Sequence, residues 1–301
     1  MHQNFKGIFT ALTTPFEGEN ISPAKFHANI SKYNEIDLAG YVIGGSTGES
    51  VYLSNDECIS LVKTAKKNAS PGRKIIAGTD RESTKNTLDF TNRAADEGID
   101  AALICMPHYY KSLMNTDSLK KHYLTIAEQS RVPILIYSIP RNTGIMPTPE
   151  LIIELSQHPN ILGIKDSSGN LAFCEEVCPR LAPGSAFFLG AGSIIFPGLL
   201  MGASGGILTL AAAVPELCSK LYRLFLNKKW EAAKKLQLDL IPLNQAVTKI
   251  YGVPGAKYVL DLRGLYGGPC RLPLLPLEEK AKQQIKKILT KLNIKTNLNY
   301  S

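Results

Sequence analysis

Short hydrophobic runs alternate along the first 210 residues with longer segments that mix hydrophobic and polar positions. The runs are four to six residues long, as buried β-strands are, and occupy residues 7–12, 41–45, 74–78, 101–106, 134–137, 161–165, 186–190 and 205–210. Between them, segments such as 55–67 and 84–97 carry hydrophobic residues at helical spacing, with acidic residues early. Repeated strand and helix units predict an α/β fold with a parallel sheet.

The number of runs selects one architecture within this class. Eight parallel strands close naturally into a TIM (β/α)8 barrel, whose active site lies at the carboxyl ends of the strands. An open doubly wound sheet is the alternative, but no Gly-x-Gly-x-x-Gly turn follows the first run and no P-loop is present. We therefore predict a barrel over residues 1–225.

The pattern changes after the eighth run. From Pro215 onward it is helical throughout, with predicted breaks at 252–255 and 266–269. Near the end of the chain, lysines alternate with hydrophobic residues as they do on an amphipathic helix over 280–292. We predict a C-terminal helical subdomain over residues 226–301.

Composition narrows the classes of partner. The 301 residues carry 34 Lys and Arg against 26 Asp and Glu, a net charge of +8 that would suit a polyanion. Much of the excess falls on the solvated face of the last helix, and no nucleic-acid motif accompanies it, so we expect no nucleic-acid partner. No segment has a membrane-length hydrophobic run or the pattern of a signal peptide, so we expect no membrane association.

The six cysteines are scattered and form no Cys-x-x-Cys pair, which favours a reduced, cytoplasmic protein. Cys174 and Cys178 would share a helix face, but no histidine pair or further cysteine completes a metal site. No cluster of Asp, Glu and His suggests a catalytic metal either. We expect neither a metal nor a nucleotide cofactor.

Lys165 is the residue that most strongly indicates chemistry. It ends the hydrophobic run 161–165, where burial lowers the pKa of an amine and leaves it nucleophilic near pH 7. A structural lysine, paired with Asp166 or extended to the surface, is the alternative for this residue taken alone. Its neighbours at the other strand ends favour the chemical interpretation.

Those neighbours supply hydroxyl groups. The second run ends in a Gly-rich loop, where backbone amides with Ser46 and Thr47 suit a carboxylate, although such a loop can also simply cap a helix. The fourth run leads to Tyr109 and the fifth ends at Tyr137. Formation of an imine and then an enamine on a lysine needs proton transfers, which tyrosines near the amine can supply.

Three motifs together resemble one family. Gly44-Gly-Ser-Thr-Gly-Glu-Ser50, Tyr137-Ser-Ile-Pro140 and Gly163-Ile-Lys-Asp-Ser-Ser-Gly169 are similar to motifs of the dihydrodipicolinate synthase and N-acetylneuraminate lyase family of class I pyruvate aldolases. The resemblance covers nearly the whole chain. It implies a homotetramer, a dimer of dimers, that acts on small 2-oxo acids through a covalent imine on Lys165, with no separate cofactor.

The resemblance also assigns roles to residues. It implies that Tyr137 shuttles protons and that Thr47 links Tyr137 to a tyrosine of the neighbouring subunit, Tyr109. Ser46 and Thr47 would hold the carboxylate of pyruvate, and the backbone at Ile207 would line its pocket.

The second substrate is where members of the family differ. In the synthase an arginine that grips aspartate semialdehyde stands directly before Thr-Gly; here that position is Asn142, and Arg141 comes one residue earlier. Ser167 resembles a hydroxyl of the 4-hydroxy-2-oxoglutarate aldolase branch, whereas Thr47 departs from that branch. We expect an aldolase that cleaves or condenses a small 2-oxo acid. Dihydrodipicolinate synthesis is the alternative, and a non-catalytic barrel that senses a small acid is the alternative of another class.

Overall fold

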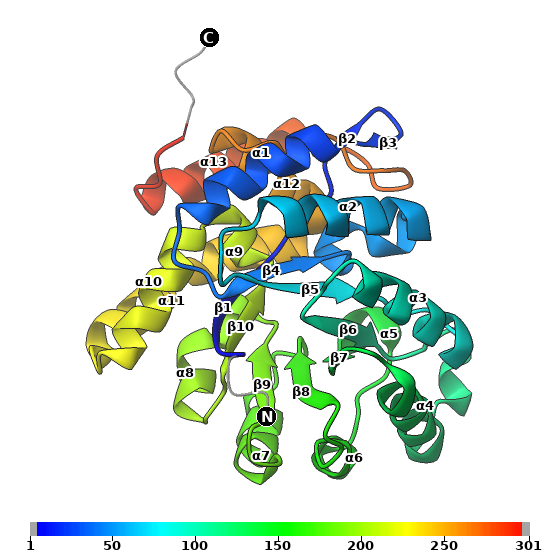
Figure 1. The fold of residues 1–301 in the computed structure, drawn as a ribbon. Coiled ribbons are helices and arrows are strands. Elements are labelled where there is room, and N and C mark those ends of the chain that lie inside the picture. Colours follow the sequence, from blue (N-terminus) through cyan, green and yellow to red (C-terminus); the bar gives the residue numbers. More distant parts are fainter. Residues whose placement is uncertain (1–4, 297–301) are drawn as a thin grey trace.

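Eight parallel strands close into a barrel in the computed structural model, which describes residues 5–296 (Figure 1). Each strand pairs with its neighbours in the chain, and the first closes the circle with the last. The barrel strands are β1 (Gly7–Ala11), β4 (Gly40–Ile43), β5 (Lys74–Gly78), β6 (Ala101–Cys105), β7 (Ile134–Ser138), β8 (Ile161–Asp166), β9 (Ala186–Leu189) and β10 (Gly205–Leu208). The predicted TIM barrel is confirmed.

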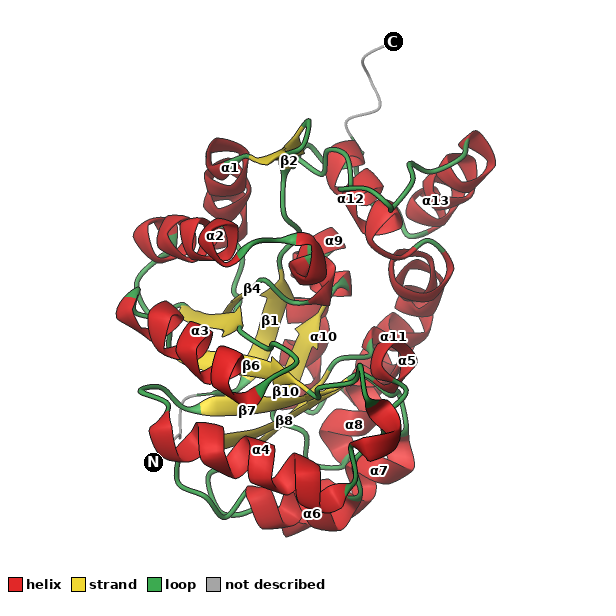
Figure 2. Ribbon diagram, turned by 90° about the vertical axis from the view of Figure 1, so that its right-hand side faces the viewer, coloured by secondary structure: helices red, strands yellow, loops and turns green. Residues whose placement is uncertain are grey.

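Helices surround the strands on the outside (Figure 2). They are α1 (Pro23–Asn34), α2 (Asn55–Asn68), α3 (Thr84–Asp96), α4 (Thr116–Gln129), α6 (Pro149–Leu155), α7 (Leu171–Val177), α8 (Ile195–Leu200) and α10 (Pro215–Leu226), with single turns α5 (Pro140–Thr143) and α9 (Leu210–Ala213). Polar side chains fix where several of them begin. Ser54 caps α2 in a capping box with Glu57, and Asn115 caps α4.

The strands are hydrophobic without interruption because both of their faces are buried. Alternate residues of β5 and β6, such as Ile76 and Leu103, point into the barrel, while Ile75 and Ile104 pack against the helices. This alternation positions the site, because it decides which residue beyond each strand end faces the interior.

The C-terminal part is helical and consists of α11 (Trp230–Gln245), a π-helical turn η6 (Ala246–Ile250), α12 (Gly252–Leu262) and α13 (Glu279–Lys291). The predicted boundary after residue 225 falls at the end of α10. The predicted break at 252–255 is wrong, since the interruption lies at Tyr251 and α12 begins at Gly252. Pro254 is accommodated in the first turn of α12, where backbone N–H groups have no partner within the helix.

One further element was not expected from the sequence. Strands β2 (Phe16–Glu17) and β3 (Asn20–Ile21) form a small antiparallel hairpin after β1. Figures 1 and 2 both place this hairpin at the end of the molecule that carries α12. The segment after β1 therefore lies close to the C-terminal helices.

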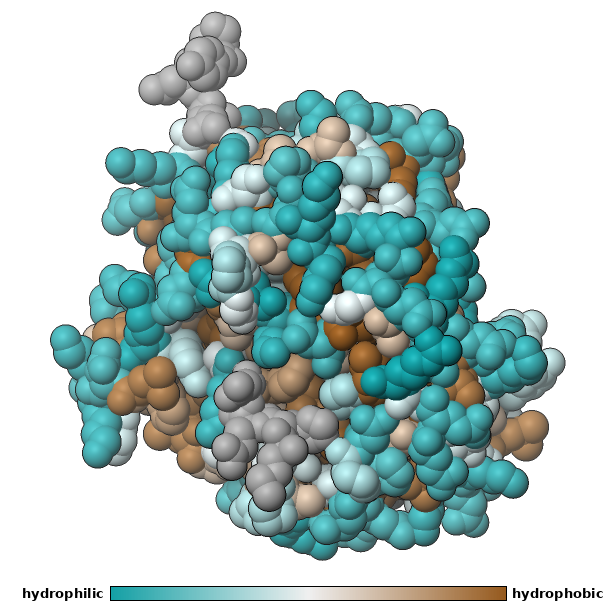
Figure 3. Space-filling model, in the orientation of Figure 1, coloured by the Kyte–Doolittle hydropathy of each residue, from teal (hydrophilic) through white to brown (hydrophobic). Residues whose placement is uncertain are grey.

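The visible surface in Figure 3 is mostly hydrophilic, with a hydrophobic patch at the left over α10 and α11. Large hydrophobic side chains exposed at these helices are Leu226, Trp230 and Leu238. Within residues 5–296, no helix is both long enough and apolar enough to cross a bilayer.

Candidate active site

Lys165 lies near the carboxyl end of β8 and is 96% buried, since only 4% of its surface is exposed. Its Nζ lies 3.9 Å from the centre of the Tyr137 ring. Desolvation lowers the pKa of this amine to about 7, against the opposing influence of Cys105 and Asp80. About half of the amine is therefore neutral at pH 7 and able to attack a carbonyl carbon.

Tyr137 is the residue of β7 that pairs with Lys165. Its hydroxyl lies 3.4 Å from Oγ of Ser46. Burial raises the pKa of the phenol, and hydrogen bonds from Ser46 and Ser167 oppose that shift. The hydroxyl is protonated at neutral pH, so it can donate a proton to a group on Lys165 and take it back.

The loop 44–50 follows β4 and contains one short turn, η1 (Ser46–Gly48), and a second turn, η2 (Ser50–Tyr52), begins at its last residue. Gly78 of β5 allows this loop to approach, because a Cβ there would lie 2.0 Å from the carbonyl oxygen of Gly44. The first N–H groups of a helical turn have no partner within the turn, so those of Ser46 and Thr47 are available to an anion. The loop thus has the chemistry expected of a carboxylate site.

Thr47 has a different partner from the one that the family resemblance implies. Its Oγ1 lies 2.6 Å from Oγ1 of Thr209, which follows β10, and Ser46 is the loop residue within reach of Tyr137. The role of Thr47 in a proton relay stays a prediction.

The tyrosines after β6 lie on the surface. Tyr109 is 77% exposed and Tyr110 is 67% exposed, and their rings pack edge to face with centres 5.0 Å apart. Oε2 of Glu82 accepts hydrogen bonds from the backbone N–H groups of His108 and Tyr109, which fixes the loop. The Tyr109 side chain therefore points to solvent in a single copy of the chain.

Arg141 is held against the C-terminal helices. It donates hydrogen bonds to the carbonyl oxygens of Thr248, at 2.9 Å, and Lys249, at 3.0 Å. Asn142 lies beside it in the single turn α5. The Arg141 guanidinium thus binds backbone carbonyl groups of the π-helical turn η6.

Two other predicted residues lie around the strand ends. Ile207 is buried inside the barrel, where it pairs with Phe9. Ser167 follows β8, and its Oγ would lie 1.9 Å from a Cβ at residue 190, so Gly190 makes room for the hydroxyl.

Asp80 is a charged residue of the site that sequence reasoning missed. Thr79 extends the pairing of β5 with β6 and points outward, where its hydroxyl bonds to Thr91 on α3, so Asp80 falls on the inner side. Desolvation raises the pKa of its carboxyl, while the Cys105 backbone, Arg81 and His108 lower it. The position of Asp80, two residues beyond the predicted strand 74–78, was the available signal.

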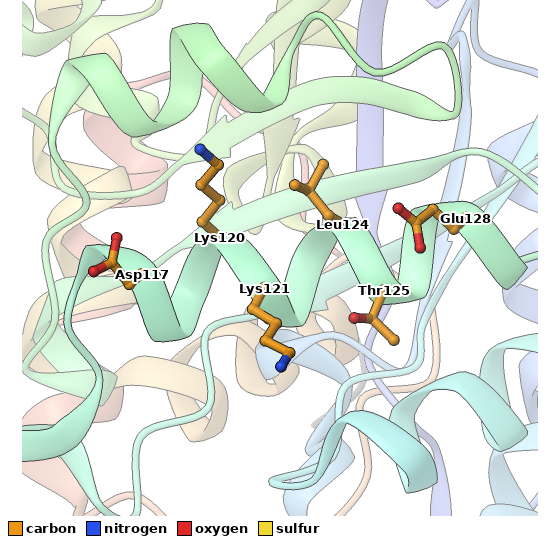
Figure 4. A pocket seen from close by; sticks show the side chains of 6 residues that line it. All are labelled: Asp117, Lys120, Lys121, Leu124, Thr125 and Glu128. Carbon is orange, nitrogen blue, oxygen red and sulfur yellow. The ribbon is translucent and has the colours of Figure 1, made fainter.

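A shallow hollow on the outer surface is separate from this site. Figure 4 shows it along one helix, α4, lined by Asp117, Lys120, Lys121, Leu124, Thr125 and Glu128. No group of three or more His, Cys, Asp or Glu side chains able to hold a metal occurs in the described part of the chain.

A barrel that holds a half-neutral lysine against a tyrosine, with a carboxylate-type loop opposite, defines a class I Schiff-base lyase. The comparisons agree. A model of the "Dihydrodipicolinate synthetase family" matches residues 4–292. The chain therefore belongs to the dihydrodipicolinate synthase family.

Curated relatives and solved structures are similar over nearly their full lengths. A 4-hydroxy-tetrahydrodipicolinate synthase of Listeria monocytogenes is 33% identical over 285 residues, covering 94% of this chain and 97% of the relative. One of Methanothrix thermoacetophila is 30% identical, covering 96% and 97%. Dihydrodipicolinate synthase of Acinetobacter baumannii, solved with pyruvate, superposes with a TM-score of 0.91 at 28% identity, covering 96% of this chain and 99% of that one. The Aquifex aeolicus enzyme gives 0.91 at 26% identity, covering 97% and 100%.

Proposed function

We propose that this enzyme forms an imine between Lys165 and pyruvate and condenses the resulting enamine with an aldehyde, as a 4-hydroxy-tetrahydrodipicolinate synthase does. The observation that carries the imine step is the buried Lys165, with a pKa of about 7, lying 3.9 Å from the Tyr137 ring centre. The names of the curated relatives support aspartate semialdehyde as the aldehyde. They support this reaction over the 2-oxo acid aldolase that the sequence led us to expect first.

Each step has a residue suited to it. The neutral Lys165 amine attacks the keto carbon of pyruvate, and the carbinolamine loses water after its hydroxyl takes a proton from Tyr137. The iminium then loses a methyl proton to the Tyr137 phenolate, which gives the enamine, and the methylene carbon of the enamine attacks the aldehyde. Ser46 and Thr47, with the amides of loop 44–50, would hold the pyruvate carboxylate throughout.

One observation favours a second candidate, the cleavage of a 4-hydroxy-2-oxo acid. Arg141 is bound to the carbonyl oxygens of Thr248 and Lys249, and the residue directly before Thr143 is Asn142. An arginine so occupied is a poor partner for the carboxylate of aspartate semialdehyde. The departure therefore counts against the synthase and leaves the aldolase open.

The assembly is part of the same proposal. Tyr109, Tyr110, Val51 and Leu113 are exposed hydrophobic side chains on the loops after β4 and β6. A second copy of the chain would cover these side chains and receive Tyr109 at its own Tyr137, as a homotetramer built from dimers requires. The cytoplasmic location expected from the free cysteines belongs to this proposal too.

Borohydride reduction in the presence of pyruvate, followed by intact mass, tests the imine. We expect one pyruvate adduct per chain, lost in Lys165→Ala and kept in Lys121→Ala, a control on the outer helix α4. No adduct, or an equal adduct in Lys165→Ala, would leave the non-catalytic sensor as the better account.

The aldehyde is tested in a second assay with the same proteins. Pyruvate consumption with aspartate semialdehyde is compared with pyruvate release from 4-hydroxy-2-oxoglutarate, each coupled to a spectroscopic readout. Turnover of about 1 s⁻¹ or more in one of the two assays, absent in Lys165→Ala, identifies the reaction. Release from the hydroxy acid alone would replace the first candidate by the second.

A further inference from the structure

A buried carboxylate lies directly behind the loop that is suited to bind the carboxylate of the substrate. Glu49 follows the turn Ser46–Gly48, and its side chain is fully buried. Its backbone is left-handed, with φ of 58°, a conformation that costs a non-glycine residue free energy and persists only where contacts enforce it. The buried charge of Glu49 therefore needs a partner of opposite charge, and its backbone conformation needs surrounding contacts that hold it.

The partner comes from the C-terminal helices. Nζ of Lys257, on α12, lies 2.5 Å from Oε1 of Glu49, and the Lys257 side chain is 1% exposed. Lys257 also donates a hydrogen bond of 2.6 Å to the carbonyl oxygen of Pro269, and its Nζ lies 4.5 Å from the Phe16 ring centre. This buried ion pair connects the barrel to the C-terminal helices.

The segment after α12 holds the other carboxylate oxygen. The backbone N–H of Arg271 donates to Oε2 of Glu49 at 2.9 Å. The Arg271 guanidinium in turn bonds to Glu57 of α2, at 2.6 and 3.0 Å, and to the carbonyl oxygen of Tyr52. The loop 44–50 is thus fastened on its far side by charged groups that no reaction step uses.

We propose that Lys257 is a positioning residue of the active site, which keeps loop 44–50 able to bind a substrate carboxylate by neutralising the charge of Glu49. The inference rests on the proposed function, in which this loop binds pyruvate. Without Lys257, the negative charge of Glu49 would stand two residues from the amides that receive another negative charge, in surroundings that screen it poorly.

The ion pair could stabilise the fold only, or it could neutralise Glu49 for the benefit of substrate binding, and the two roles predict different results. If the pair only stabilises the fold, loss of either partner weakens pyruvate binding in the same direction. If Lys257 neutralises Glu49, loss of Lys257 weakens binding, whereas loss of the Glu49 charge does not. The two single variants and the double variant therefore separate the two explanations.

The experiment measures the pyruvate concentration that half-saturates borohydride trapping, with KM and kcat, in full-length Lys257→Met, Glu49→Gln and the double variant. We expect Lys257→Met to raise the half-saturating concentration about tenfold, with kcat changed much less. Glu49→Gln should stay at or below the wild-type value, and the double variant should return to within about threefold of it. Lys282→Met is the matched control, because Lys282 belongs to an exposed ion pair with Glu279 in the same subdomain.

Thermal unfolding checks that each variant is folded. The double variant removes both charges at once, a change that buried pairs often tolerate, so it stays informative even if Lys257→Met fails to fold. Equal increases in both single variants, an unchanged Lys257→Met, or a folded double variant as weak as Lys257→Met would each overturn the proposal. A wild-type protein that traps no pyruvate would instead overturn the proposed function and this inference with it.

Discussion

The ammonium group of Lys165 lies over the face of the Tyr137 ring, 3.9 Å from its centre, on the neighbouring strand of the barrel. A ring face attracts a cation, while the burial that surrounds the pair favours the neutral amine. The second effect is the larger, since the pKa of Lys165 falls to about 7. One contact thus keeps the amine beside the residue that we propose as its proton donor.

The pH dependence of imine formation follows from that pKa. Only the neutral amine attacks, so the rate of pyruvate trapping by Lys165 should fall as the pH drops through about 7, and level off above about 8. The measurement is the initial rate of borohydride-trapped adduct between pH 5.5 and 9, a range chosen to bracket that pKa within about 2 units. A rate that is flat down to pH 6 would contradict the lowered pKa.

Asp80 should tune the same group. Its carboxylate favours the protonated form of Lys165, so Asp80→Asn should move the midpoint of this pH profile to lower pH. Asp117→Asn, the same change on the outer surface of α4, should leave the midpoint in place. An unmoved midpoint in a folded Asp80→Asn protein would mean that Asp80 carries no charge at neutral pH.

Tyr137→Phe should separate imine formation from turnover. The variant keeps the ring beside Lys165 and loses the hydroxyl that lies near Ser46, so we expect trapping to persist while kcat falls by about 10² to 10⁴. Tyr222→Phe is the control, because the Tyr222 ring lies near Gly7, at the opposite end of the barrel. Full turnover in Tyr137→Phe would assign the proton transfer to another group.

Lys165 should also lower the stability of the fold. Its pKa is about 7 in the folded protein and near 10.5 when the chain unfolds, so the unfolded state binds a proton more tightly. The contribution of Lys165 to the free energy of unfolding therefore rises as the pH increases from about 7 to 10.5, and it is least favourable below pH 7. Lys165→Met should raise the free energy of unfolding at pH 7 by roughly 1 to 4 kcal/mol, and by less at pH 10. Urea unfolding at the two pH values measures the difference, and an equal gain at both would contradict the linkage.

The strands could be predicted because their burial on both faces leaves a continuous hydrophobic signal, such as Ile134 to Tyr137. Lys165 could be found for the same reason, as a charge at the end of such a signal. The partner of Thr47 could not, because the sequence does not record which way a side chain points from a turn; only the structure brings Thr209 to it. Asp80 was missed because a loop carboxyl beside Arg81 reads as an exposed polar group, and only the outward direction of Thr79 shows that it belongs to the interior.

The carboxyl-terminal helices were the harder part of the prediction. Gly252 and Pro254 predict a break, yet the first turn of a helix accepts both residues. Nothing in the local sequence around Lys257 indicates that it ends beside Glu49, more than two hundred residues earlier. Such long-range pairs become visible only when the two segments are folded against each other.

The close passage of Gly78 beneath the carbonyl group of Gly44 limits how this enzyme can diversify. A methyl group at residue 78 would meet the backbone of Gly44 and Gly45 in loop 44–50, so that side of the site must be built from the main chain alone. Related sequences therefore cannot change their substrate by introducing a side chain at residue 78. The variable part of their specificity must come instead from strand ends where side chains have room, such as those that carry Asp80 and Asn142.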